Sequence, residues 1–473
     1  VGRQIHREEM SDDEWVRITT LGCCREVGRA AFILSTPETR ILIDCGDKPG
    51  AEGEVPYLQV PEALGAGAAT LDAVVLTHAH LDHSALVPLL FKYGYDGPIY
   101  TTEPSRDLMG LLTLDYLDVA AKDGRTPPYE SAQVRDAIKH TIPLEYGDVT
   151  DVAPDVKLTF HNAGHILGSA VTHFHIGDGL YNVAFSGDIH YEDTRLFNGA
   201  VNDFPRVETL VLESTYGGRD DYQTDQADSE EALKEVINET YEQGGKVVIP
   251  AFAVGRSQEI MLVLEEAMRK GEIPEMPVHL DGMIWEATAI HTTYPEYLRD
   301  DLRDRIFHDD ENPFLADQFN HIDAGEDERQ EVADGDECII ISTSGMIEGG
   351  PIMSWLRHIG PDPDSNLVFV GYQAQGTLGR RIQNGWDEIP VDGWGGGSRG
   401  DTLTLEMGTE VVDGFSGHAD RQGLENFVKT MNPRPEKVLC VHGDERSVQD
   451  LSSALYHDYN MRTFAPKNLE TFR

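Results

Sequence analysis

Residues 77–84 read THAHLDHS, so three histidines and one aspartate stand close together in the chain. The apolar run before them, residues 71–76, predicts a short buried strand, and residues 85–93 predict a helix. Along extended backbone His78 and His80 point to the same side, so their ring nitrogen atoms can reach one metal ion. Asp82 and His83 follow where the chain turns away and can serve a second metal nearby. The alternative is a polar turn with coincidental histidines.

The length of 473 residues allows two or three domains, and a hydrophobic content of 40% supports sizeable cores. No run of about 18 apolar residues predicts a transmembrane helix, and no signal peptide is visible. The chain opens at Val1 and not at methionine, which leaves room for an upstream segment. Five cysteines without a CxxC pair predict reduced, buried thiols in a cytoplasmic protein: Cys23, Cys24, Cys45, Cys338 and Cys440.

The net charge is −45, from 83 acidic and 38 basic residues, and the acidic residues are spread along the chain. We interpret this excess as adaptation to molar salt, as in the cytoplasm of a halophilic archaeon. The alternative is a partner with a basic surface. The charge by itself argues against a nucleic-acid partner, whereas the candidate site argues for one.

Further candidate residues stand at the ends of predicted strands. Asp44 ends the strand ILID, where it can orient a metal-bound group, although a turn aspartate is equally common there. His165 lies in the glycine-flanked loop NAGHILGSA, and Asp188 follows a predicted hairpin strand in SGDIH. A carboxylate can place one oxygen on each of two metals, so Asp188 is the candidate bridging ligand. Glu213 ends the strand before ESTYGG.

After Glu213 helices and strands alternate for roughly 185 residues, which is long enough for a domain with a parallel sheet. No Walker A sequence and no GxGxxG after a strand occurs, so we expect no nucleotide cofactor. Loops after the strands carry arginines, whose guanidinium groups suit bidentate contact with phosphate. The alternative is that they pair with the many carboxylates. The candidate RNA contacts are Arg256, Ser344, Arg380 and Arg381.

Two late motifs complete the pattern. A glycine-rich connection, residues 393–400, precedes FSGHAD with His418 and KVLCVHGDE with His442, and residues 447–459 predict a closing helix. The strand-end histidines, the inserted domain and these motifs resemble the β-CASP family, the nucleic-acid-processing branch of the metallo-β-lactamase superfamily. With the segments REVGR, ESTYG, GYQAQGTLGRRI and NLETFR, the chain is most similar to archaeal homologues of the cleavage and polyadenylation specificity factor.

This resemblance implies an α/β fold, namely a metallo-β-lactamase αβ/βα sandwich with an inserted β-CASP domain built on a parallel sheet. Residues 1–212 would form the first part of the sandwich, 213–397 the β-CASP domain and 398–473 the second part. Full-length archaeal members usually carry KH-type RNA-binding domains before the nuclease. We expect that region to be absent or removed here, because the resemblance begins at about residue 15.

The resemblance also implies a site with two Zn²⁺ ions. One zinc would be held by His78, His80 and His165, the other by Asp82, His83 and His442, with Asp188 between them. Asp44 would support these ligands, and Asp82 would also act in catalysis. Glu213 and His418 match positions that do not primarily bind metal. His418 is the candidate proton donor to the leaving 3′ oxygen, with Glu213 holding its other nitrogen.

The function implied is a zinc-dependent ribonuclease that cleaves single-stranded RNA inside the chain, with 5′-to-3′ trimming, in transcript 3′-end processing and transcription termination. One alternative is a mainly processive 5′-to-3′ exoribonuclease in RNA decay, and another is a non-catalytic RNA-binding scaffold. The expected partners are single-stranded RNA, a second copy through the C-terminal region, and RNA polymerase or other transcription factors. No membrane is expected, and the location would be cytoplasmic.

Overall fold

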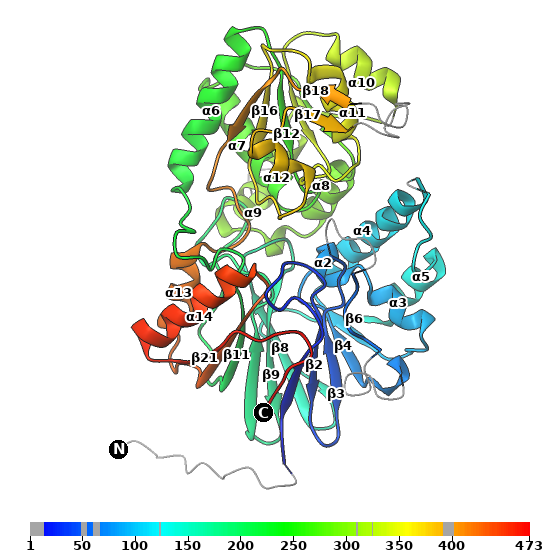
Figure 1. Cartoon of the computed structure of the whole chain (residues 1–473), viewed down its shortest axis with the longest axis vertical. Coiled ribbons are helices and arrows are strands. Elements are labelled where there is room, and N and C mark those ends of the chain that lie inside the picture. Colours follow the sequence, from blue (N-terminus) through cyan, green and yellow to red (C-terminus); the bar gives the residue numbers. More distant parts are fainter. Residues whose placement is uncertain are drawn as a thin grey trace.

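The computed structural model describes residues 14–48, 54–59, 67–122, 124–308, 311–323, 325–390 and 402–473. Figure 1 shows two bodies stacked along the long axis. The first and last parts of the chain form the lower body, and the middle part, in green and yellow, forms the upper one. The predicted glycine-rich connection, residues 393–400, lies outside the described residues.

The lower body contains two seven-stranded sheets. The first has the order β22-β1-β2-β3-β4-β5-β6, with β1 (Arg17–Thr20), β2 (Phe32–Ser35), β3 (Arg40–Ile43), β4 (Ala73–Val75), β5 (Ile99–Thr101), β6 (Thr141–Pro143) and β22 (Thr471–Phe472). The second has the order β21-β20-β11-β10-β9-β8-β7, with β7 (Val149–Ala153), β8 (Val156–Asn162), β9 (Ala170–Ile176), β10 (Tyr181–Phe185), β11 (Thr209–Glu213), β20 (Lys437–Val441) and β21 (Arg462–Phe464).

The two sheets pack face to face over an apolar core that includes Phe32, Phe174 and Phe185. Helices α3 (Val87–Lys92), α4 (Glu103–Lys122) and α5 (Ser131–His140) cover the outer face of the first sheet. Helices α13 (Arg421–Lys429) and α14 (Glu445–Tyr459) cover the second. Strands β4, β11 and β20 are therefore buried throughout their length, as central strands between layers must be. The predicted αβ/βα sandwich is confirmed.

The upper body is built on a six-stranded sheet in which every pairing is parallel. Its order is β14-β13-β15-β12-β16-β19, with β12 (Val247–Pro250), β13 (Val278–Asp281), β14 (Phe319–His321), β15 (Ile339–Ser342), β16 (Asn366–Phe369) and β19 (Gly408–Val411). The helices are α6 (Gln226–Glu242), α7 (Arg256–Lys270), α8 (Ile284–Thr293), α9 (Asp300–His308), α10 (Glu326–Ala333), α11 (Ile352–Ile359) and α12 (Leu378–Gln383). The predicted parallel α/β insert is confirmed.

The chain enters the insert after β11 and returns to the sandwich before α13. Strand β20 then pairs in parallel with β11, so that Glu213 stands opposite Val441. A small hairpin, β17 (Glu388–Pro390) with β18 (Thr402–Thr404), leads to β19, which extends the parallel sheet beside β16. Because β19 follows residue 397, we propose that the inserted domain ends at Val411, later than the sequence suggested.

Local structure differs from the prediction around the metal-ligand stretch. The helix expected over residues 85–93 is α3, and a short helix that was not predicted, α2 (Leu81–Ser84), precedes it, so Asp82 and His83 lie in a helical turn. Residues 15–43 form the three strands β1, β2 and β3, and positive φ angles at Cys23, Arg25 and Arg29 bend the connection after β1. Within the described part of the chain, no helix has the length and apolar composition needed to cross a membrane.

Candidate metal centre

The candidate residues meet where strands of the sandwich end beneath the insert. His78 follows β4, Asp188 follows β10, Glu213 ends β11 and His442 follows β20. Parallel neighbours end at the same edge of a sheet, which explains how residues more than two hundred positions apart become adjacent. The insert faces this edge, since the ring of Phe252 lies 6.0 Å from the ring of His80.

Asp188 stands at the centre of the cluster. Its Oδ2 atom lies 3.5 Å from Nε2 of His78 and 3.7 Å from Nε2 of His165. Its Oδ1 atom lies 3.4 Å from Nε2 of His83 and 3.2 Å from Nδ1 of His442. Each oxygen of one buried carboxylate therefore faces a different pair of imidazoles, which is the arrangement expected of a group shared by two metal sites.

The remaining predicted ligands complete two groups around Asp188. Nδ1 of His80 lies 3.0 Å from Nε2 of His165 on one side. Oδ2 of Asp82 lies 3.3 Å from Nε2 of His442 on the other. Within each group the candidate ligand atoms all lie within 4.8 Å of one another, and the groups are His78, His80, His165 and Asp188, and Asp82, His83, Asp188 and His442. The structure thus brings together every residue that the sequence analysis assigned to metal.

Unpaired buried atoms show that these residues fit a metal. Nε2 of His78, Nε2 of His83 and Oδ1 of Asp188 are buried and make no hydrogen bond of good geometry to a described residue. Buried polar atoms without hydrogen-bond partners are costly, so three of them that converge on one place fit a bound cation. A donor set of imidazole nitrogen and carboxylate oxygen suits zinc.

The protonation states of the His78, His80 and His165 group favour cation binding. Burial lowers the pKa of His80 to about 4 and holds the pKa values of His78 and His165 well below the usual range. These imidazoles are therefore neutral and can offer a lone pair. Burial opposes ionisation of Asp82, but His83 and His442 lower the pKa of its carboxyl to about 2, so this group remains an anion.

The five cysteines are free and buried, as predicted. Burial raises the pKa of the Cys440 thiol to about 12, and burial with the nearby Asp44 and Asp47 carboxylates raises the pKa of Cys45 further still. Both groups remain thiols at neutral pH, and a thiol is a poor ligand for zinc. Neither one belongs to the two candidate ligand groups.

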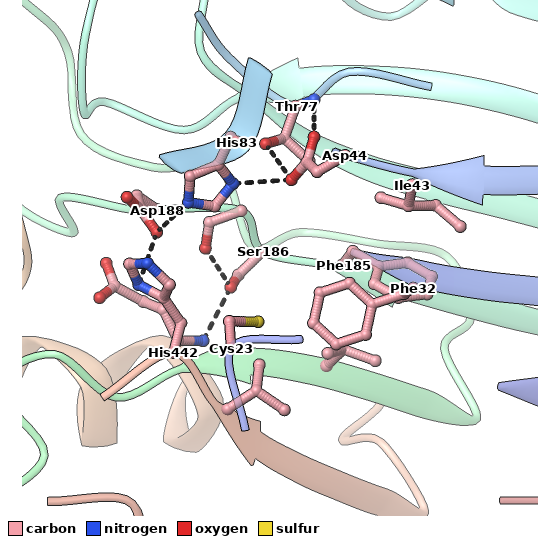
Figure 2. A pocket seen from close by; sticks show the side chains of 14 residues that line it. Cys23, Phe32, Ile43, Asp44, Thr77, His83, Phe185, Ser186, Asp188 and His442 are labelled. Carbon is pink, nitrogen blue, oxygen red and sulfur yellow. Dashed lines mark hydrogen bonds and ion pairs between the residues drawn. The ribbon is translucent and has the colours of Figure 1, made fainter. Parts of the chain in front are cut away.

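Asp44 occupies the supporting position that the sequence suggested. Its Oδ2 atom lies 2.7 Å from Nδ1 of His83 and accepts a hydrogen bond from the Thr77 hydroxyl, while Oδ1 accepts one from the Thr77 amide. Figure 2 shows this chain of contacts running from Thr77 through Asp44 and His83 to Asp188. Because Nδ1 of His83 donates to Asp44, its Nε2 atom is left to face Asp188 and a metal.

Glu213 and His418 form a pair at the edge of the cluster. Both carboxylate oxygens of Glu213 lie 3.1 Å from Nδ1 of His418, and Oε1 also accepts a hydrogen bond from the Ile189 amide. Burial lowers the pKa of His418, but Glu213 and Asp188 more than offset this and raise it to about 9. A third possible ligand group joins Asp188, Glu213 and His418, so metal contact and proton transfer are both open to His418.

The candidate RNA contacts differ in exposure and in their hydrogen-bond partners. Arg256 is 6% exposed at the start of α7, where Nη1 donates a 2.7 Å hydrogen bond to the Phe415 carbonyl. It therefore braces the loop before His418 from inside the protein. The hydroxyl of Ser344 is engaged within its own loop, donating to the Gly349 carbonyl and accepting from the Glu348 amide. Arg380 and Arg381 are exposed on α12, in a position to contact a ligand.

Three contacts of the site were not predicted. Thr77 holds Asp44, although its place beside His78 in the THAHLDHS stretch could have suggested a role. Gln223 donates from Nε2 to the His418 carbonyl over 3.2 Å, and Ser416 accepts from the His418 amide. Gln223 lies at the start of the insert, and nothing in the local sequence pattern indicates this long-range contact.

Comparisons with known proteins agree with this architecture. Residues 25–242 match the model of the metallo-beta-lactamase superfamily, and residues 257–382 match the Beta-Casp domain. Residues 402–466 match the Zn-dependent metallo-hydrolase RNA specificity domain. The structure also resembles a protein of unknown function from Enterococcus faecalis V583, with a TM-score of 0.57 at 13% identity, over 97% of this chain and 99% of that one. At so low an identity this likeness shows the fold alone.

Curated archaeal proteins are much more similar in sequence. Transcription termination factor FttA of Methanosarcina mazei is 59% identical over 474 residues, which cover all of this chain and 74% of the relative. The protein of the same name from Methanothermobacter thermautotrophicus is 51% identical, again over all of this chain and 74% of the relative. That of Lokiarchaeum is 44% identical over 99% of this chain and 73% of the relative. The chain therefore belongs to the β-CASP family of the metallo-β-lactamase superfamily, together with these archaeal proteins.

Proposed function

We propose that the protein is a zinc-dependent ribonuclease that cleaves single-stranded RNA internally and also trims it from the 5′ end. Its role would lie in transcript 3′-end processing and transcription termination. The observation that carries this proposal is the position of Asp188, with one oxygen facing each of two histidine groups and the Glu213–His418 pair beside it. The name of the archaeal relatives and the match to an RNA specificity domain support the biological role.

Two zinc ions would occupy the centre in this proposal. His78, His80 and His165 would hold one, and Asp82, His83 and His442 the other, with Asp188 shared between them. When bound, zinc supplies Lewis acidity that activates water near neutral pH and stabilises the charge that develops on a phosphoryl group. Asp44 would keep the His83 ring in the orientation and tautomer that a metal needs.

The proton for the leaving group would come from His418. A phosphodiester that is cut to leave a 3′-hydroxyl and a 5′-phosphate releases the 3′ oxygen of the upstream nucleotide, which must gain a proton. Glu213 fixes Nδ1 of His418, so Nε2 is the atom that can donate. With a pKa of about 9, His418 carries this proton at neutral pH. Its side chain is 17% exposed, whereas that of Glu213 is almost completely buried.

Further parts of the proposal concern partners and location. A second copy would bind through the C-terminal region, and RNA polymerase or other transcription factors would bring the enzyme to its transcript in the cytoplasm. The support is the resemblance to archaeal β-CASP proteins and the name that the relatives carry. A non-catalytic scaffold is disfavoured, because the complete set of predicted ligands converges on Asp188.

One experiment distinguishes the proposed endonuclease from a purely 5′-dependent exonuclease. A single RNA sequence is prepared with a 5′-triphosphate, a 5′-monophosphate, a 5′-hydroxyl or as a closed circle, and all product ends are mapped. We expect every form to be cut, with 3′-hydroxyl and 5′-phosphate ends, and Asp188→Asn to be inactive. Degradation of the 5′-monophosphate form alone, with the circle intact, would show an exonuclease. No cleavage of any form would refute the proposed enzyme.

A further inference from the structure

A second cavity, of about 180 Å³, lies beside the candidate metal centre. Three segments that are distant in the sequence form its walls. The first is the start of the insert after Glu213, the second is the end of β16, and the third runs from β19 to the loop before His418. The lining residues that matter here are Tyr216, Asp220, Tyr222, Val370, Val411 and Asp413.

The cavity shares a wall with the proposed proton donor. Gln223 and Ser416 line the cavity, and both are hydrogen-bonded to the backbone of His418. The ring of Tyr216, a third lining residue, lies 6.4 Å from the ring of His418. A group that occupies the cavity therefore lies close to His418, on the side of its backbone and of the Tyr216 ring.

The lining suits a flat, partly apolar ring. Tyr222 is 60% exposed and Val411 is 49% exposed at the cavity, although most large apolar side chains of the protein are covered. Phe369 and Val370 are buried and form apolar wall. Stacking of bases on aromatic side chains is one of the ways in which proteins bind single-stranded nucleic acid.

The charges in the cavity disfavour a phosphate group and favour a group that donates hydrogen bonds. Asp220 and Asp413 line it, are exposed, and make no side-chain hydrogen bond or ion pair with any residue that the structure describes. Two unpaired carboxylates repel the RNA backbone. They accept hydrogen bonds from amino groups, which adenine, cytosine and guanine carry and uracil lacks. Asp221 differs, because its carboxylate already accepts from the Gly218 amide.

We propose that this cavity binds the base of the nucleotide immediately upstream of the cut and selects bases that carry an amino group over uracil. Tyr222 provides the stacking surface, and Asp220 and Asp413 accept from the amino group. The upstream position follows from the leaving group, since the 3′ oxygen that His418 protonates belongs to that nucleotide. This assignment rests on the proposed ribonuclease function and adds to it a base preference of the same site.

The test uses the full chain with zinc and a pool of single-stranded RNAs randomised in sequence, with product ends determined by sequencing. We expect uracil to be at least about tenfold depleted at the position upstream of the cut, as one hydrogen bond to a charged acceptor allows. In Asp220→Ala/Asp413→Ala the depletion should fall below about threefold, while cleavage continues. Tyr222→Ala should lower cleavage about tenfold after every base, because stacking contributes to all of them.

Matched controls lie on α14, away from the cavity. Tyr456→Ala removes a tyrosine that is 58% exposed, and Asp458→Ala removes an exposed carboxylate. Both should keep the wild-type preference and rate, and thermal unfolding should be similar for all variants. A wild-type enzyme without any preference upstream of the cut, or a preference unchanged in Asp220→Ala/Asp413→Ala, would overturn the assignment.

A second measurement separates failure of the cavity from failure of the enzyme. Single-stranded RNA with 8-azidoadenosine in place of adenosine is irradiated with the wild-type protein, and the cross-linked peptides are identified. Cross-links within residues 216–223 or 411–416 support the base site even if no RNA is cut, in which case only the proposed ribonuclease fails. Cleavage with every cross-link elsewhere would refute the base site and leave the ribonuclease standing.

Discussion

The Glu213 carboxylate lies 3.1 Å from Nδ1 of His418, although the two residues are separated by the entire inserted domain. Glu213 comes from the end of β11 and His418 from the loop that follows β19. The pair forms only when the chain has completed the insert and returned to the sandwich. Folding of the insert is thereby tied to completion of the proposed catalytic site.

Replacing His418 tests the proton donor. His418→Ala should retain both metals and slow RNA cleavage by about 10²–10⁴-fold, the range for loss of a general acid. An RNA with a 3′-thiolate leaving group at the scissile bond needs no proton, so His418→Ala should slow the cleavage of this substrate far less. Equal losses on the oxygen and sulfur substrates would rule out proton donation by His418, and zinc content measured alongside separates this result from metal loss.

Asp44→Asn tests the support of His83. The asparagine tolerates the positive φ of this position, but its single amide oxygen cannot accept from the Thr77 backbone amide and from Nδ1 of His83 at once, as the two carboxylate oxygens do. We expect zinc affinity at the Asp82–His83–His442 group to fall about 10–100-fold. Asp72→Asn, an exposed change next to β4, is the matched control. Unchanged zinc affinity in Asp44→Asn would show that Asp44 has no supporting role.

The buried His291, which is not one of the candidate metal ligands, predicts that the stability of the protein falls at acid pH. It is completely buried in α8, and burial lowers its pKa from 6.5 to about 4. The unfolded chain binds a proton at the His291 imidazole more readily than the folded chain does. The free energy of unfolding is therefore not reduced by His291 above pH 6.5, and it decreases as the pH falls from 6.5 toward 4. The loss should reach about 3 kcal/mol.

Denaturant unfolding of the metal-free protein between pH 7 and pH 4 provides the measurement for His291. In His291→Gln the stability should fall less steeply over this range than in the wild type, whatever the variant's stability at pH 7. His308→Gln, at an exposed position at the end of α9, should follow the wild-type curve. Parallel curves for His291→Gln and the wild type would exclude a buried neutral His291.

The net charge of −45 predicts an unusual response to salt. The Debye length is about 30 Å at 0.01 M salt and about 3 Å at 1 M, so repulsion among the carboxylates and with RNA fades at high salt. Ordinary RNA-binding proteins lose affinity as salt rises. We expect the thermal unfolding temperature and single-turnover cleavage to rise from 0.1 M toward molar KCl at constant free zinc. A maximum of both near 0.1 M would contradict adaptation to salt and favour a basic partner.

Several candidate residues could be placed at strand ends from the sequence, and the structure brings them together. His78, Asp188 and His442 each follow an apolar strand of the sandwich, which the period of the strands could indicate one by one. The family resemblance then supplied the pairing of late and early motifs, which no local pattern contains. The short helix α2 before α3 was missed because helix boundaries depend on local hydrogen bonds that periodicity does not specify.

Arg256 shows the limit of such prediction. Its arginine side chain after a strand end suggested a phosphate contact, yet it is buried against the Phe415 carbonyl. The start of α7 docks on the loop that carries His418, a contact across 159 residues that local sequence cannot reveal. Gln223 reaches the same loop for the same reason. Long-range packing, and not residue type, determines whether these polar groups meet RNA or the protein itself.

Stepwise addition of zinc to the metal-free protein, followed by cleavage of single-stranded RNA, tests the shared role of Asp188 most directly. We predict that the wild type binds two zinc ions per chain and that cleavage rises until the second is bound, while Asp188→Ala binds less and cuts nothing. Full wild-type cleavage with one zinc per chain, or cleavage that persists without metal, would contradict a two-metal ribonuclease.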